Sequence, residues 1–270
     1  LMFVRKIIYK LNKIKQEIIK GEIFQAVLSQ RFSASYNIDP FDFYRALRSI
    51  NPSPYLVFLN LSTYQIICSS PETMINVKNK KITLRPIAGT RRRGKDLKED
   101  QKMKKELLSD KKELAEHLML VDLGRNDVGQ ISKKNTVKVT EKNIIEYYSH
   151  VMHIVSNVTG HLKNKLDPID VLFAGLPAGT VSGAPKIRSL EILEKEEPIN
   201  REFYSGSVCY LDVNGDMDSC INLRTAMIKD KKMYKNIQDF HIKLCEKNID
   251  TYKKQTSKIY KHGGWILEKL

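Results

Sequence analysis

The sequence predicts an α+β fold, in which helices are inserted among antiparallel strands. Short segments of alternating apolar and polar residues recur along the chain between turn residues, as antiparallel strands require. Segments with helical spacing of apolar residues interrupt them without a regular strand-helix alternation. The length of 270 residues suffices for one large domain or two small ones with a buried core.

Two helices are predicted near the start of the chain. Lysines and isoleucines at helical spacing predict an amphipathic helix over residues 1–20. The helical pattern around residues 13–28 has Gly21 as an interruption. A second helix is predicted over residues 41–50, and it ends at Asn51-Pro52-Ser53-Pro54 because prolines cannot continue it.

An antiparallel meander of four strands is predicted next, with Asn79-Lys80 as a hairpin tip. Its strands cover residues 55–60, 64–69, 74–78 and 81–85. Residues 91–102 are highly charged and predict a solvated loop. A helix follows over residues 103–122, with a break near Ser109 because Asp110 and Glu113 resemble a capping box.

The second half of the chain predicts strands, a loop, a helix and a hairpin. Strands are expected over residues 136–140 and 147–160. A loop over residues 177–184 leads into a helix over residues 185–197, which starts with proline. Residues 205–213 and 217–229 form a hairpin about Asn214-Gly215.

Charge and hydropathy argue against nucleic-acid and membrane partners. The net charge of +15 comes from lysines spread through helices and loops, and the densest cluster, Arg91-Arg92-Arg93, has no aromatic residues between its arginines. No run of eighteen apolar residues occurs, so no membrane span is expected.

The four cysteines have no Cys-x-x-Cys spacing, so neither a zinc site nor a disulfide framework is indicated. Cys209 and Cys220 are expected to face each other across the hairpin. We expect reduced thiols in the cytoplasm, with a plastid stroma as the alternative.

Two carboxylates on the helix over residues 103–122 suggest a metal site. Glu113 and Glu116 are three residues apart and therefore neighbours on one helix face. A hard cation such as Mg²⁺ binds carboxylate oxygens of this kind. The alternative is a solvated pair on a lysine-rich helix.

His153 is a candidate acid or base. In a helix, His150 and His153 would lie on one side and suggest a metal pair, but the β-branched flanks favour a strand, which places them on opposite faces. The alternative is a core histidine with its hydrogen bonds satisfied.

The glycine-rich loop over residues 175–186 opens a helix, so its backbone N–H groups can hold an anion. Thr180, Ser182 and Lys186 add donors. Any glycine-rich turn before a helix has a similar form, and the spacing of a P-loop is absent.

Several segments together resemble the signature segments of chorismate-using enzymes, and the resemblance covers roughly residues 13–230. They are residues 86–91, 115–127, 148–153 and 177–186, extended by 21–25, 29–32 and 70–72. Ala88 replaces the lysine typical of aminodeoxychorismate synthases, and residues 180–186 keep Thr-Val-Ser-Gly-Ala-Pro-Lys, from which isochorismate-type enzymes depart. The resemblance is therefore to anthranilate synthase large subunits.

The resemblance implies antiparallel sheets packed as a sandwich with helices outside, and a lyase that converts chorismate and ammonia to anthranilate and pyruvate. It also implies a glutamine amidotransferase partner that delivers the ammonia. The implied site residues are Glu116 for Mg²⁺, Glu113 as general acid, His153 in the elimination, and Thr90, Thr180, Tyr204 and Arg224 as substrate contacts. The nearest alternative is an aminodeoxychorismate synthase large subunit.

The resemblance ends at Lys229-Asp230. The family continues there with a strand, a Gly-Ala-Gly turn and a helix whose carboxylates complete the metal site, and nothing in residues 231–270 corresponds. We therefore expect a catalytic domain over residues 1–230, incomplete at its N-terminal side, and a divergent tail over residues 231–270. We also expect little or no activity, and a catalytically dead binding subunit is the alternative function.

Overall fold

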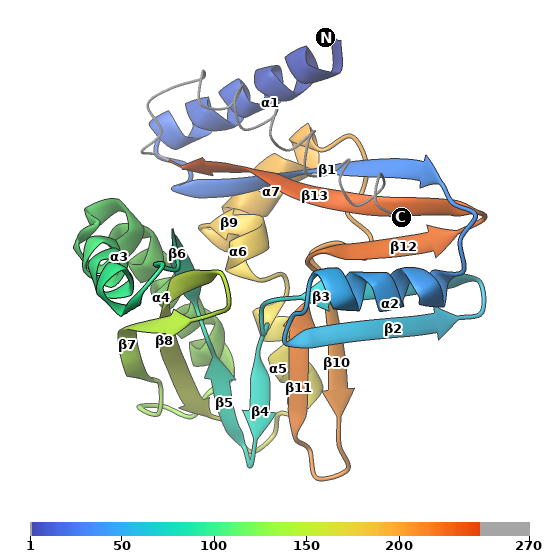
Figure 1. The fold of residues 1–270 in the computed structure, drawn as a ribbon. Coiled ribbons are helices and arrows are strands. Elements are labelled where there is room, and N and C mark those ends of the chain that lie inside the picture. The colour runs from blue at the N-terminus through green and yellow to red at the C-terminus, as the bar shows by residue number, and fades with distance from the viewer. Residues whose placement is uncertain (1, 244–270) are drawn as a thin grey trace.

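The computed structural model describes residues 2–243 and contains two antiparallel β-sheets with helices packed against them (Figure 1). The first sheet has six strands in the order β2-β3-β12-β13-β1-β9. Its members are β1 (Gln25–Ser35), β2 (Tyr55–Leu61), β3 (Tyr64–Ser70), β9 (Gly183–Ala184), β12 (Thr225–Lys229) and β13 (Lys232–Lys243). Each pairing is antiparallel, which confirms the predicted α+β class.

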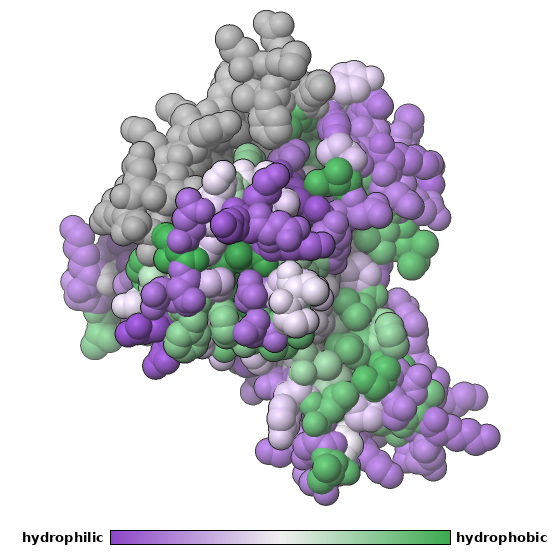
Figure 2. Space-filling view, turned by 90° about the vertical axis from the view of Figure 1, so that its right-hand side faces the viewer, coloured by the Kyte–Doolittle hydropathy of each residue, from purple (hydrophilic) through white to green (hydrophobic). Residues whose placement is uncertain are grey.

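The second sheet has seven strands in the order β10-β11-β4-β5-β8-β6, with β7 also paired to β8. Its members are β4 (Asn76–Lys78), β5 (Lys81–Leu84), β6 (Ile87–Arg92), β7 (Lys138–Tyr147), β8 (Val151–His161), β10 (Ser207–Leu211) and β11 (Met217–Ile221). This sheet lies below the first in Figure 1. Apolar surface appears on the lower part of the face shown in Figure 2. Exposed apolar side chains of β10 and its hairpin are Tyr210, Leu211 and Val213.

Aspartate side chains cap the N-terminal ends of four helices. The helices are α1 (Met2–Ile19), α2 (Pro40–Ile50), α3 (Leu97–Ser109), α4 (Lys111–Ile131), α5 (Pro168–Gly175), α6 (Gly179–Ser182) and α7 (Lys186–Glu196). The capped ones are α2, α3, α4 and α5. Asp39 and Asp110 accept hydrogen bonds from first-turn N–H groups of α2 and α4. The predicted break near Ser109 is thus confirmed. Within residues 2–243, no helix is long and apolar enough to span a membrane.

Helix α4 packs closely on the second sheet and so fixes one wall of the site described below. Its buried face carries His117, Leu120, Val121, Gly124, Asp127, Val128 and Ile131. A Cβ atom on Gly124 would lie only 2.8 Å from Leu84 Cδ2, so glycine permits the close approach of α4 to β5.

Several element predictions were wrong. The strand expected over residues 217–229 is two strands in different sheets, β11 and β12, and the loop expected over residues 177–184 contains α6 and β9. The helical pattern around residues 13–28 ends at Ile19, because Gly21 has a φ of +81° and Gln25 already begins β1. The four-strand meander is divided between the sheets, since β3 pairs with β12 and β4 pairs with β11. The expected loop over residues 91–102 contains the end of β6 and the start of α3.

The cysteine prediction was also wrong. Cys209 pairs with Ser219 and Cys220 with Val208, so the two cysteines are one register step apart. Cys68 and Cys220 are both buried, and the Cys68 thiol donates to Leu223 O at 3.6 Å.

A strand does follow Asp230, against expectation. Strand β13 pairs with β12 through Lys229↔Lys232 and with β1 over ten register positions, from Gln25↔Lys243 to Ser35↔Lys232. It therefore lies inside the first sheet. We also predicted that the tail lacks a Gly-Ala-Gly turn and a second metal carboxylate. That prediction falls mostly on residues 244–270, which lie outside the described part of the chain. The division at residue 230 stays a prediction.

Candidate chorismate site

A cavity of about 560 Å³ lies where the two sheets, α4 and α6 meet. Its wall includes five of the side chains that the sequence singled out: Thr90, Glu116, His153, Thr180 and Arg224. They come from β6, α4, β8, α6 and the turn before β12. Chain segments far apart in sequence thus bring these side chains together.

The hydrogen bonds of His153 indicate which of its two ring nitrogens carries the proton. Its Nδ1 lies 3.0 Å from Gly89 O and 3.0 Å from Thr90 Oγ1. A carbonyl oxygen only accepts, so Nδ1 carries a proton and Nε2 keeps its lone pair in the neutral ring. His153 can therefore act as a base through Nε2. The expectation that His150 lies on the opposite face was wrong, because His150 precedes β8 and also lines the cavity.

Arg224 supplies positive charge to the cavity. Its side chain is exposed there, and the surrounding protein lowers the pKa of its guanidinium by desolvation. No carboxylate among residues 7–235, whose side chains the structure describes, forms an ion pair with it. A guanidinium in this setting favours a carboxylate ligand, which it can bind through two parallel hydrogen bonds.

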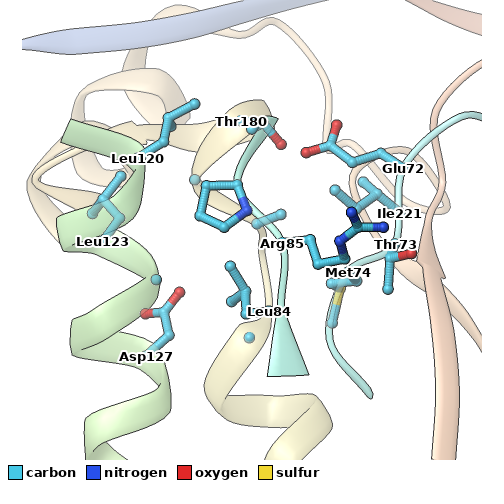
Figure 3. A pocket seen from close by; sticks show the side chains of 15 residues that line it. Glu72, Thr73, Met74, Leu84, Arg85, Leu120, Leu123, Asp127, Thr180 and Ile221 are labelled. Atoms are coloured by element: carbon cyan, nitrogen blue, oxygen red, sulfur yellow. The ribbon is translucent and has the colours of Figure 1, made fainter. Parts of the chain in front are cut away.

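Glu72 is the functional candidate to which the sequence reasoning gave no role. It lies in the loop between β3 and β4, lines the cavity, and points its carboxyl group toward Thr180 (Figure 3). Burial raises the pKa of Glu72 to about 7, although a hydrogen bond from Thr180 opposes the shift. A carboxyl group that titrates near neutrality is suited to general acid catalysis. The segment 70–72 was noted only as part of the resemblance.

Replacing Glu72 by Gln is expected to remove a loss of stability between pH 5 and 8. The folded-state pKa of about 7 lies above the ordinary 4.5. As pH rises, the unfolded chain releases this proton first, so the free energy of unfolding of the wild type falls until the pH passes about 7. The total is at most about 3 kcal/mol, and less where water reaches the carboxyl group. Urea unfolding of both proteins at pH 5 and pH 8 measures this change in the free energy of unfolding. An equal decline of that free energy in Glu72→Gln would contradict the prediction.

Glu113 and Tyr204 do not line the cavity. Glu113 Oε1 lies 3.6 Å from Arg91 Nη1, and Arg91 also bonds Glu106 and Asp110. Tyr204 is 3% exposed and lies in the apolar core beside Arg201, whose Cζ is 5.5 Å from the ring centroid. The roles assigned to these two residues stay predictions, and the geometry offers Glu72 as an acid that lines the cavity with the other site residues.

The glycine-rich loop uses most of its expected donors within the protein. Lys186 Nζ lies 2.7 Å from Asp127 Oδ2, and Ser182 Oγ donates to Ala178 O. Gly183 and Ala184 form β9 and pair with β1. Of the three predicted donors, Thr180 is the one that lines the cavity.

The donor set for a metal is small in the described part of the chain. No three His, Cys, Asp or Glu side chains cluster as ligands among residues 7–235, whose side chains are described. Glu116 places one carboxylate on the cavity wall. Mg²⁺ is commonly held by one or two carboxylates together with water and substrate oxygens, so Glu116 fits as one ligand.

Comparison with known proteins identifies the family of the chain. Residues 8–237 match the family model described as chorismate binding enzyme. The chain is 54% identical to anthranilate synthase component 1 of Cereibacter sphaeroides and 52% identical to that of Pseudomonas aeruginosa, in each case over 83% of the chain and 45% of the relative. It thus spans about half the length of the curated relatives it matches.

Solved structures show the same similarity. Anthranilate synthase component I from Streptococcus pneumoniae superposes with a TM-score of 0.84 and 43% identity, covering 94% of this chain and 56% of that one. The menaquinone-specific isochorismate synthase from Escherichia coli gives a TM-score of 0.80 at 22% identity, covering 93% and 58%, and shows a shared fold. With both the family model and these relatives matching most of its length, the chain belongs to the chorismate binding enzymes.

Proposed function

We propose that this chain is the chorismate-binding part of an anthranilate synthase component I, which converts chorismate and ammonia to anthranilate and pyruvate in tryptophan biosynthesis. The observation that carries the proposal is Arg224, whose guanidinium faces the cavity without an ion-pair partner among the described side chains of residues 7–235. Chorismate has two carboxylates, so a cationic group in a cavity of about 560 Å³ suits it.

Each residue that lines the cavity has a separate role in the proposed reaction. Arg224 would hold one carboxylate, with Thr90 and Thr180 as further hydrogen-bond donors. When ammonia adds to the ring, Glu72 would give its proton to the departing ring hydroxyl, which leaves as water. His153 Nε2 would then take the ring proton as pyruvate is eliminated.

A metal ion and a second protein complete the proposal. Mg²⁺ held by Glu116 would supply positive charge at the ring carboxylate. Ammonia would come from a glutamine amidotransferase subunit. The cysteines described within residues 2–243 are free thiols, which supports a cytoplasmic location.

Calorimetric titration with chorismate, with and without Mg²⁺, tests the proposal. We expect binding to the folded chain that strengthens with Mg²⁺. Added ammonium then tests turnover: anthranilate fluorescence with equimolar pyruvate would contradict the expected inactivity, whereas an aminated product without pyruvate would indicate aminodeoxychorismate synthase chemistry. A natively folded chain that ignores chorismate would overturn the proposed function.

A further inference from the structure

Glu146 on β7 holds two side chains that belong to the walls of the site. One carboxylate oxygen accepts a hydrogen bond from Arg85 Nη2. The other, Oε2, accepts from the Tyr148 hydroxyl at 3.0 Å. Tyr148 lines the large cavity, and Arg85 lines a small adjoining cavity of about 30 Å³. Glu146 thus connects the two spaces without lining either.

Tyr148 contacts the candidate base. Its ring meets the His153 ring edge to face, with centroids 5.4 Å apart and planes at 65°. Glu146 and His153 are directly opposite in the β7–β8 register. His153 is held at Nδ1 by Gly89 and Thr90, so Tyr148 restrains the imidazole from another side.

Arg85 contacts the same space as the candidate acid. Glu72 and Arg85 both line the small cavity, and Figure 3 shows their side chains beside each other. Arg85 Nε is buried and has no hydrogen-bond partner among the side chains described in residues 7–235. A cavity of about 30 Å³ has room for one water molecule, which would satisfy this N–H group.

We propose that Glu146 is a positioning residue, which holds Tyr148 against His153 and Arg85 beside Glu72. The catalytic relevance of this inference rests on the proposed function, whereas the contacts do not. A carboxylate that accepts from two groups at once keeps both side chains in one rotamer. Loss of Glu146 therefore lets the side chains of Tyr148 and Arg85 adopt other rotamers.

The test compares Glu146→Leu with Glu141→Leu. Glu141 lies on the same strand and accepts a hydrogen bond from Asn157 Nδ2 at 2.8 Å, but neither residue lines the cavity. NMR signals of the His153 ring C–H groups, assigned with His153→Gln, report the position of the imidazole directly. We expect them to move in Glu146→Leu and in Tyr148→Phe, which keeps the ring but loses the hydroxyl that Glu146 accepts from. We expect them to stay in Glu141→Leu and to return toward wild type in Glu146→Gln, which keeps an acceptor for Arg85.

Equal His153 signals in Glu146→Leu and Glu141→Leu would overturn the proposal. Should Glu146→Leu not fold, Tyr148→Phe carries the same measurement. Chorismate affinity is measured in parallel, and we expect a loss of about tenfold in Glu146→Leu and none in Glu141→Leu, because small displacements of site groups are costly. Absence of chorismate binding by the wild type would sink the proposed function, while the His153 signals would still decide the positioning role.

Discussion

Replacing Arg224 by Gln is expected to weaken chorismate binding about 100-fold, which corresponds to about 2.7 kcal/mol. The variant removes the guanidinium that faces the cavity and keeps a side chain of similar length. Charge-assisted hydrogen bonds to a carboxylate are stronger than neutral ones, and each contributes about 1.5–3 kcal/mol. The chorismate affinity of Arg224→Lys should lie between those of the wild type and Arg224→Gln, since an ammonium group keeps the charge but loses the planar fork of the guanidinium. Calorimetry at constant salt concentration measures all three.

Arg45→Gln is the matched control for Arg224. Arg45 is 71% exposed and pairs only with Asp42 on the same helix, at 3.2 Å. Its loss changes the net charge by the same amount and leaves the cavity untouched. Affinities within threefold of each other for Arg224→Gln and wild type would contradict the role of Arg224. A fall of equal size in both glutamine variants would assign the effect to overall charge.

The sequence predicted element types better than sheet membership. Turn residues and alternation placed β2, β3, β4 and β5 within one or two residues of their observed bounds. Alternation carries no information on which strands pair, so the change of sheet between β3 and β4 was missed. The same limit applies to β13, whose lysines and asparagines pair through the backbone with β1 and β12.

The site was predictable where a residue belonged to a recognisable segment, and not where a neighbour from another element decided its role. Helical spacing puts Glu113 and Glu116 on one face, but the cavity edge runs between them and Arg91 from β6 pairs with Glu113. Glu72 has no local signal of a raised pKa, because the burial that causes the shift is provided by the fold. The sequence predicted Lys186 as a donor to an anion, but in the fold Asp127 of α4 lies beside it and forms an ion pair with it.

Replacing Lys186 by Met is expected to lower the free energy of unfolding by about 3–5 kcal/mol, because it leaves a buried carboxylate without its partner. The two side chains, Lys186 and Asp127, are 12% and 5% exposed. Burial raises the pKa of Asp127, and Lys186 opposes that shift. Without Lys186 the folded state keeps Asp127 protonated to higher pH than the unfolded state does. The destabilisation should therefore grow as pH rises from 5 to 8.

A double variant separates loss of the ion pair from loss of packing. Asp127→Leu with Lys186→Met removes both charges, and Asp127 borders the small cavity, which leaves room for the larger side chain. Replacing both members of a buried pair by apolar residues is often close to neutral, so the double variant should regain most of the stability that Lys186→Met loses. Arg125→Gln is the control on the same helix: its pair with Asp122 is 58% and 60% exposed, and its loss should cost under about 1 kcal/mol. Urea unfolding of the four proteins measures these differences. A double variant less stable than Lys186→Met would contradict the assignment of the loss to an unpaired buried carboxylate.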